Sequence, residues 1–75
     1  MPTVARFPNC RLEVRFLDHP PPHVHVVMSD GRDNLIEIDT LAMLGPIPAR
    51  ELIEVLAWAA GHRAVLIAEW RKYHP

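Results

Sequence analysis

Apolar and polar residues alternate along much of the first forty positions of the chain. The alternation is clearest over residues 10–18, where Leu12, Val14 and Phe16 are separated by charged residues. A period of two residues places successive side chains on opposite sides of a strand. This stretch therefore predicts a strand with one buried face, to which these three residues belong.

Shorter runs predict the rest of a sheet. Residues 23–28 and residues 35–39 both alternate, the first between valines and histidines and the second between isoleucines and acidic residues. Asp30-Gly31 lies between the two runs, and Asp-Gly is the strongest short signal for a hairpin turn. Residues 3–7 fit a further short strand. We therefore expect a small, mostly antiparallel sheet of three or four strands.

The period changes after the breaker sequence Gly45-Pro46-Ile47-Pro48. Pro48 suits the first position of a helix, where its missing N–H is not needed. Beyond it, apolar residues recur with the 3.6-residue period of an amphipathic helix. This apolar stripe consists of Leu52, Val55, Leu56, Ala59, Leu66, Trp70 and Tyr73. The predicted fold is α+β, with a C-terminal helix packed on one face of the sheet.

An unbroken helix over residues 48–74 conflicts with the size of the chain. At 1.5 Å per residue it would be about 40 Å long, more than a domain of this size measures across. Either Gly61 breaks the helix, or its end projects into a partner. Arg63 bears on the choice, because in an unbroken helix its charge would lie unpaired within the apolar stripe. We expect Arg63 to pair with Glu37 or Asp39.

The length and composition indicate one domain, residues 1–75, with a strand half (1–44) and a helical half (48–74). The chain has 75 residues, 49% of them hydrophobic and 23% charged, which leaves no room for a second core. A chain of this length buries only about 60% of the surface that it exposes when unfolded. We therefore expect it to bind a protein partner or to form a homo-oligomer.

Cysteine content, net charge and the length of apolar runs limit the cellular compartment and the partners expected for the protein. Cys10 is the only cysteine, so no internal disulfide forms, and a reducing compartment, the cytoplasm, is expected. The net charge of −1 gives no overall basic field for nucleic acid, although a local patch is compatible with RNA binding. No apolar run reaches the roughly 18 residues of a membrane span, and the first residues lack the apolar segment of a signal peptide.

The main candidate for chemistry is a histidine cluster, Asp18-His19-Pro20-Pro21-Pro22-His23-Val24-His25, in a chain that has 5 histidines. His23 and His25 are two residues apart on a predicted strand, so both imidazoles point to the same face. Two such nitrogens can bind one zinc-like divalent ion at about 2.1 Å. Asp18 or His19 would supply a third ligand.

The same residues have two other interpretations. In a structural one, the imidazoles satisfy backbone groups that the prolines leave unpaired. In a catalytic one, the sheet face has what metal-independent RNA cleavage needs. Glu13 or His23 would take the proton of the 2′-hydroxyl, His25 would protonate the leaving oxygen, and Arg15 would stabilise the negative charge of the phosphorane. A solvated sheet face carries a similar mixture of charges, so the pattern alone does not decide.

Two tryptophans and a histidine on the predicted helix are supporting candidates. Trp58 and His62 are four residues apart and therefore neighbours. Placed over the sheet edge near the histidine cluster, His62 would be an additional metal ligand or a hydrogen-bond partner of Asp18. In the structural alternative, Trp58 and Trp70 are large core residues, with His62 at the rim of the core.

The motifs named above resemble those of a family of short bacterial proteins, domain of unknown function 4160. The matching features are Met1-Pro2-Thr3, the motif from Asp18 to His25, Trp58 followed by His62 and Arg63, and Trp70. The resemblance covers nearly the whole chain. The sequence departs from the family at Val24 and Val26, where Phe and Ala are common, and at Gly61, where a helix-forming residue is expected.

The resemblance implies no established activity, because none is assigned to the family. Its members are similar to components of predicted toxin–antitoxin modules, in which one protein binds and restrains another. The resemblance thus favours partner binding, in agreement with the size of the chain. Taken together, we expect a protein-interaction module with a histidine-rich site at the edge of the sheet. The alternative is a metal-dependent hydrolase or ribonuclease that uses His23 and His25.

Overall fold

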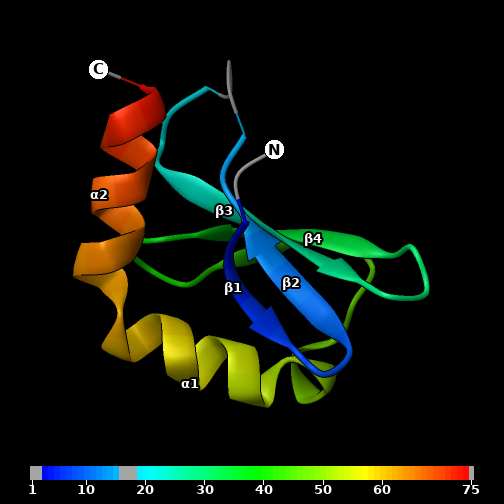
Figure 1. Cartoon of the computed structure of the whole chain (residues 1–75). Helices are drawn as coiled ribbons and strands as arrows, with labels where there is room; N and C mark the ends of the chain where they lie inside the picture. Colours follow the sequence, from blue (N-terminus) through cyan, green and yellow to red (C-terminus); the bar gives the residue numbers. More distant parts are fainter. Residues whose placement is uncertain (1–2, 16–18, 75) are drawn as a thin grey trace.

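The strands form one antiparallel sheet in which neighbours in sequence are also neighbours in space (Figure 1). The computed structural model describes residues 3–15 and 19–74. Its 5-stranded sheet has the order β1-β2-β3-β4-β5. The strands are β1 (Thr3–Phe7), β2 (Cys10–Glu13), β3 (His23–Met28), β4 (Asp33–Glu37) and β5 (Met43–Leu44). The α+β class is confirmed, with five strands rather than the three or four expected.

Two of the predicted strands, β1 and β3, have the expected bounds, and the other two are shifted. β2 ends at Glu13 rather than continuing to residue 18, and Phe16 and Asp18 lie outside the described residues. β4 begins at Asp33, two residues earlier than predicted. β5 was not predicted, because a strand of 2 residues is too short to show a period.

The strand register sorts the side chains into an apolar face and a polar face. Leu12 pairs with Val26, and Val24 pairs with Ile36, and the side chains of all four are fully buried. The residues between them point the other way. We define the polar face by Arg6, Arg11, Glu13, His23, His25, Val27, Asp33, Leu35, Glu37 and Leu44, which the register places side by side.

The helical half packs on the apolar face of the sheet. It comprises a short 3-10 helix, η1 (Ala49–Glu51), and the helices α1 (Ile53–Gly61) and α2 (Arg63–Tyr73). The α-helix thus begins later than predicted, because Pro48 precedes a 3-10 turn. The predicted apolar stripe is confirmed. Its buried members are Leu52, Val55, Ala59, Leu66 and Trp70, and Leu56 and Tyr73 are half-buried against the same core.

The helix breaks at His62, directly after Gly61, so the broken-helix alternative is confirmed. Figure 1 shows α1 and α2 running in different directions around the sheet. The break leaves Arg63 exposed, and its Nε donates to the backbone oxygen of Ile38 at 3.3 Å. Arg63 thus bonds a carbonyl rather than the carboxylate of Glu37 or Asp39, and that expected pairing was wrong. In the described part of the chain, no helix is long and apolar enough to span a membrane.

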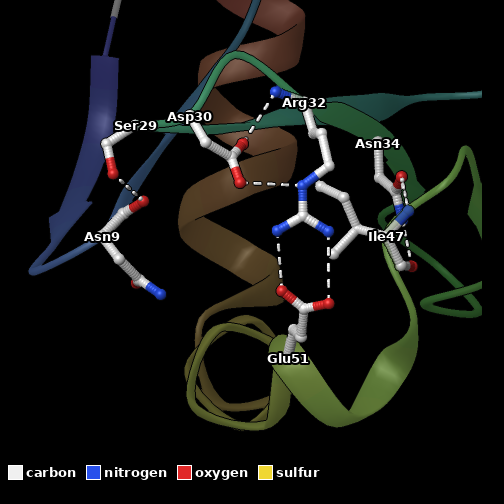
Figure 2. Close-up of polar contacts among 7 residues, drawn as sticks. All are labelled: Asn9, Ser29, Asp30, Arg32, Asn34, Ile47 and Glu51. Atoms are coloured by element: carbon white, nitrogen blue, oxygen red, sulfur yellow. Dashed lines mark hydrogen bonds and ion pairs between the residues drawn. The ribbon is translucent and has the colours of Figure 1, made fainter.

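Asn34 holds the loop after β5 against the sheet. Its Oδ1 accepts a hydrogen bond from the Ile47 N–H at 3.0 Å, and its Nδ2 donates to the Ile47 oxygen at 2.9 Å (Figure 2). Gly45 lies under the Asn34 side chain with φ +141°, and a Cβ at this position would overlap Asn34 Oδ1. This close approach explains why the breaker sequence begins with glycine.

Arg32 joins the turn between β3 and β4 to η1. Its guanidinium donates to both oxygens of Glu51, at 2.7 and 3.2 Å, and its Nε donates to Asp30 at 2.9 Å (Figure 2). The backbone N–H of Arg32 lowers the pKa of Asp30 below its ordinary value, and the Arg32 guanidinium does the same for Glu51. Both carboxylates are therefore ionised at neutral pH.

Candidate functional site

Glu13 is a buried carboxylate at the centre of the polar face. Its side chain is 2% exposed and lies between two arginines. Arg15 Nε donates to Oε1 at 2.9 Å, and Arg11 Nε donates to Oε2 at 3.2 Å. Burial raises the pKa of Glu13, but the hydrogen bonds and charges of Arg15 and Arg11 outweigh it, so the pKa lies below its ordinary value. Glu13 is thus held in its ionised form.

This pairing changes the roles expected for Glu13 and Arg15. A carboxylate with a lowered pKa is a weak proton acceptor, and each Glu13 oxygen already accepts a hydrogen bond. The structure therefore makes Glu13 a positioning residue for two guanidinium groups. Arg11 and Arg15 bond Glu13 through Nε, so the Nη groups of both arginines can still donate hydrogen bonds to a ligand. The side chains of the two arginines are 41% and 31% exposed.

His23 and His25 lie side by side on β3, as their spacing predicts, but β3 is the middle strand of the sheet, so their expected place at the sheet edge was wrong. Their ring centroids are 5.1 Å apart, at an interplanar angle of 72°. His23 Nδ1 lies 2.9 Å from the Pro21 oxygen. A carbonyl only accepts, so Nδ1 carries the proton and Nε2 is the basic nitrogen of a neutral His23 ring. The bond to Pro21 is also what the structural interpretation expects of an imidazole beside prolines.

The two tryptophans lie at different places around the sheet. Trp70, on α2, contacts His23 with a centroid distance of 5.0 Å. Trp58, on α1, contacts Phe7 of β1 instead, at 6.0 Å and an interplanar angle of 86°. Of the supporting aromatic residues, Trp70 is therefore the one that the structure brings to the histidine cluster.

Each helix ends in the same arrangement of a tryptophan and a histidine four residues later. His62 stacks on Trp58 at 4.1 Å and donates from Nδ1 to the Trp58 oxygen at 2.7 Å. His74 stacks on Trp70 at 3.7 Å and donates from Nδ1 to the Trp70 oxygen at 2.9 Å. These bonds satisfy carbonyls that a helix end leaves without a partner. His62 thus caps α1, and Asp18, its predicted partner, lies outside the described residues.

The metal site stays a prediction. Among the described residues, no three histidine, cysteine or acidic side chains lie close enough together to hold a metal ion. His19 is exposed. The predicted ligand Asp18 lies outside the part of the chain that the structure describes.

A pocket of about 170 Å³ adjoins the polar face at the turn between β1 and β2. It is lined by Arg6, Asn9, Cys10, Arg11, Val27 and Ser29, among others. Arg6 was not among the residues predicted to form a site. The sequence does contain a signal for it. Arg6 and Arg11 flank a Pro-Asn turn, and a hairpin at that turn places them opposite each other.

A family model described as Domain of unknown function (DUF4160) matches residues 12–71. The chain belongs to this family. The matched range of the DUF4160 domain includes Glu13, the histidine cluster and both tryptophans, whereas Arg6 and Arg11 precede it. No curated protein and no solved structure matches the chain.

Proposed function

We propose that this DUF4160 protein is a protein-binding domain, one member of a cytoplasmic toxin–antitoxin-like pair, and that it binds its partner through the polar face. The observation that carries the proposal is a pair of leucines on that face. Leu44 on the edge strand β5 is 72% exposed, and its register partner is the half-buried Leu35. The free, buried Cys10 is consistent with the cytoplasm.

The opposite side of the polar face indicates the chemistry of the partner. There, Arg11 and Arg15 are held by Glu13 and remain partly exposed. Arginine is enriched in protein–protein interfaces, and complementary charge steers the partners together. The expected partner surface is therefore an apolar patch beside carboxylates.

The burial of the central residues supports binding over catalysis. Glu13, His23 and His25 are only 2%, 6% and 8% exposed. A general acid or base has to approach the substrate within about 3 Å. Glu13 is instead bonded by two arginines, and the rings of His23 and His25 contact each other, which favours a structural role for these residues in the polar face.

The test is co-expression with the product of the adjacent gene, followed by calorimetric titration of the two purified proteins. We expect a stable complex, which Leu44→Asp weakens at least about tenfold, the effect of about 1.4 kcal/mol of lost contact. Ile53→Asp is the matched control, because Ile53 is 68% exposed but lies at the start of α1, among the helices. This control should bind as the parent does.

Two results would overturn the proposal. One is an unchanged affinity in Leu44→Asp, which would exclude the polar face. The other is the absence of a complex together with a dimer of the chain in light scattering that Leu44→Asp dissociates. In that case the face joins two copies of this chain, and a homo-oligomer replaces the heteromeric pair.

A metal-dependent hydrolase or ribonuclease is the second candidate, favoured by the adjacent rings of His23 and His25 and by the Nδ1 bond that orients His23. Elemental analysis of the untagged protein tests it. This candidate predicts about one zinc-like ion per chain, lost in His23→Ala/His25→Ala and retained in the control His62→Ala/His74→Ala. Metal-free parent protein, or equal loss in both variants, would reject it.

A further inference from the structure

Two arginines stand directly opposite each other where β1 meets β2. Arg6 and Arg11 are register partners, so their side chains leave the sheet on the same face. Like charges in directly opposite positions destabilise an antiparallel pair. Glu13 bonds Arg11 through Nε, whereas Arg6 has no hydrogen bond or ion pair within residues 3–15 and 19–74. The pair of like charges destabilises the sheet, and in the described part of the chain Arg6 makes no bond that compensates for it. Local destabilisation of this kind is typical of a binding site.

Arg6 and Arg11 both line one hollow, whose lining is mostly polar. Both belong to the pocket of about 170 Å³ at the β1–β2 turn, which is large enough for one small anion and the group that carries it. None of the described residues that line it is acidic. The Cys10 thiol is neutral at pH 7, because burial and then the charge of Glu54 raise its pKa. Arg6 and Arg11 are therefore the charged side chains among the described residues that line the pocket.

Hydrogen bonds join two residues of the pocket lining, Asn9 in the β1–β2 turn and Ser29 in the turn after β3. Ser29 donates its N–H and its hydroxyl to the Asn9 oxygen, at 2.9 and 3.1 Å (Figure 2 draws the hydroxyl bond). The carbonyl that would repel an anion is thus already bonded. Since Glu13 also holds Arg11 by Nε, both the wall and one of the cations are in place before any ligand binds. Such preorganisation lowers the cost of binding.

We propose that this Arg6–Arg11 pocket binds the phosphate group of a small phosphate monoester. The planar fork of arginine matches the oxygens of a phosphate in two-point hydrogen bonds. Two guanidinium groups balance a phosphate monoester, which carries a charge of about −1.5 to −2 at pH 7, better than a single carboxylate. The net charge of −1 for the whole chain disfavours a long polyanion, whose binding relies on an extended basic surface.

The test is a nuclear magnetic resonance titration of the ¹⁵N-labelled full chain, following the amides of the β1–β2 turn and the arginine Nε–H signals. The probes are inorganic phosphate, glycerol phosphate, acetate and a short RNA without terminal phosphates. We expect both phosphates to bind with millimolar affinity. We expect Arg6→Gln to weaken this binding about tenfold, the loss of one charge-assisted hydrogen bond. Arg6 is exposed, so its variant should fold, and Arg71→Gln on α2 is the control.

Several outcomes would overturn the assignment. Acetate binding as tightly as phosphate would make the ligand a carboxylate, and RNA binding more tightly than glycerol phosphate would make it a nucleic acid. Equal weakening by Arg6→Gln and Arg71→Gln would show that only general charge is involved. The inference goes beyond partner binding, and the two can fail separately: Leu44→Asp should leave the phosphate titration unchanged, and the titration needs no partner.

Discussion

The side chain of Asn34 makes the backbone hydrogen bonds that a neighbouring strand would otherwise make. It lies on the apolar face, paired with Val26, where alternation alone would call for an apolar side chain. Its amide presents an oxygen acceptor and an N–H donor in nearly the spacing of a peptide group, and these two groups bond the N–H and the oxygen of Ile47 as a neighbouring strand would. The loop that leads to the helices is thereby fixed to the sheet.

We predict that Asn34→Leu is strongly destabilising. The change leaves the Ile47 N–H and oxygen without their partner in a buried position, at a cost of about 2–4 kcal/mol for the pair. Urea unfolding followed by circular dichroism measures this loss. Asp33→Ala, at an exposed neighbouring position, should change the stability by no more than about 0.5 kcal/mol. A similar loss in both variants would contradict the importance of the Asn34 amide.

The residues of the polar face show what a sequence pattern cannot resolve. Alternation placed Glu13, His23 and His25 on one face correctly, but it left open whether that face is solvated or packed. Their burial depends on which arginines and which neighbouring strand lie beside them. Those contacts follow from the register, which a single sequence does not determine.

Among the elements, the two α-helices are unusual in how their C-terminal ends are capped. The α-helix commonly ends at a glycine in the left-handed conformation. Here Gly61 is the last residue of α1 but has no positive φ. The capping residue is His62 instead, which combines a side-chain hydrogen bond with stacking on Trp58. The same device at His74 and Trp70 ends α2.

We predict that the two contributions of the histidine cap can be separated. His62→Ala removes both the stacking and the hydrogen bond, whereas His62→Phe keeps an aromatic ring on Trp58 and loses only the hydrogen bond. The alanine variant should lose about 1 kcal/mol and the phenylalanine variant about half of that. Hydrogen exchange at the last turn of α1 is the measurement. Equal protection in the parent and the alanine variant would show that the cap adds nothing to the helix end.

The elements that the sequence predicted are those with a long enough repeat. The strands at residues 3–7 and 23–28 and the apolar stripe of the helices were found because side-chain periodicity survives in them. The strand Met43–Leu44 is defined by hydrogen bonds to β4 rather than by a repeat. The break after Gly61 followed from the length of the helix and from Arg63, which is an argument from size rather than from pattern.

At the scale of the molecule, the helix break at His62 determines how compact the protein is. The principal extents are 32 × 23 × 20 Å, and the radius of gyration is 11.2 Å, close to the roughly 11 Å of a folded chain of this length. Turning the chain at His62 lets α1 and α2 both cover the sheet. The candidate site was predicted less completely than the fold, because Arg6 and Leu44 gain their meaning only from their neighbours across the strands.

We predict that the whole protein loses stability in acid. Asp30, Glu51 and Glu13 have lowered pKa values in the folded state because of their arginine partners. A lowered folded-state pKa stabilises the protein above the unfolded value, about 4 for these groups, and the stabilisation is lost as the pH falls through the folded value. The urea midpoint should be level from pH 7 to about pH 5 and then decline.

Two variants separate the contributions to this decline. Glu13→Gln and Arg32→Gln should each be less stable at pH 7 and should each show a shallower decline between pH 5 and pH 3 than the parent. A decline as steep in both variants as in the parent would show that other carboxylates control the acid unfolding.

The pairing of each tryptophan with an imidazole also has an optical consequence. Both indoles of the chain, at Trp58 and Trp70, are in face-to-face contact with a histidine ring. A protonated imidazole accepts electrons from an excited indole and quenches its emission, and this quenching requires contact. When the imidazole is protonated, each helix end therefore contains its own fluorophore and quencher. Opening of either end can be followed by emission intensity and lifetime in the unlabelled protein.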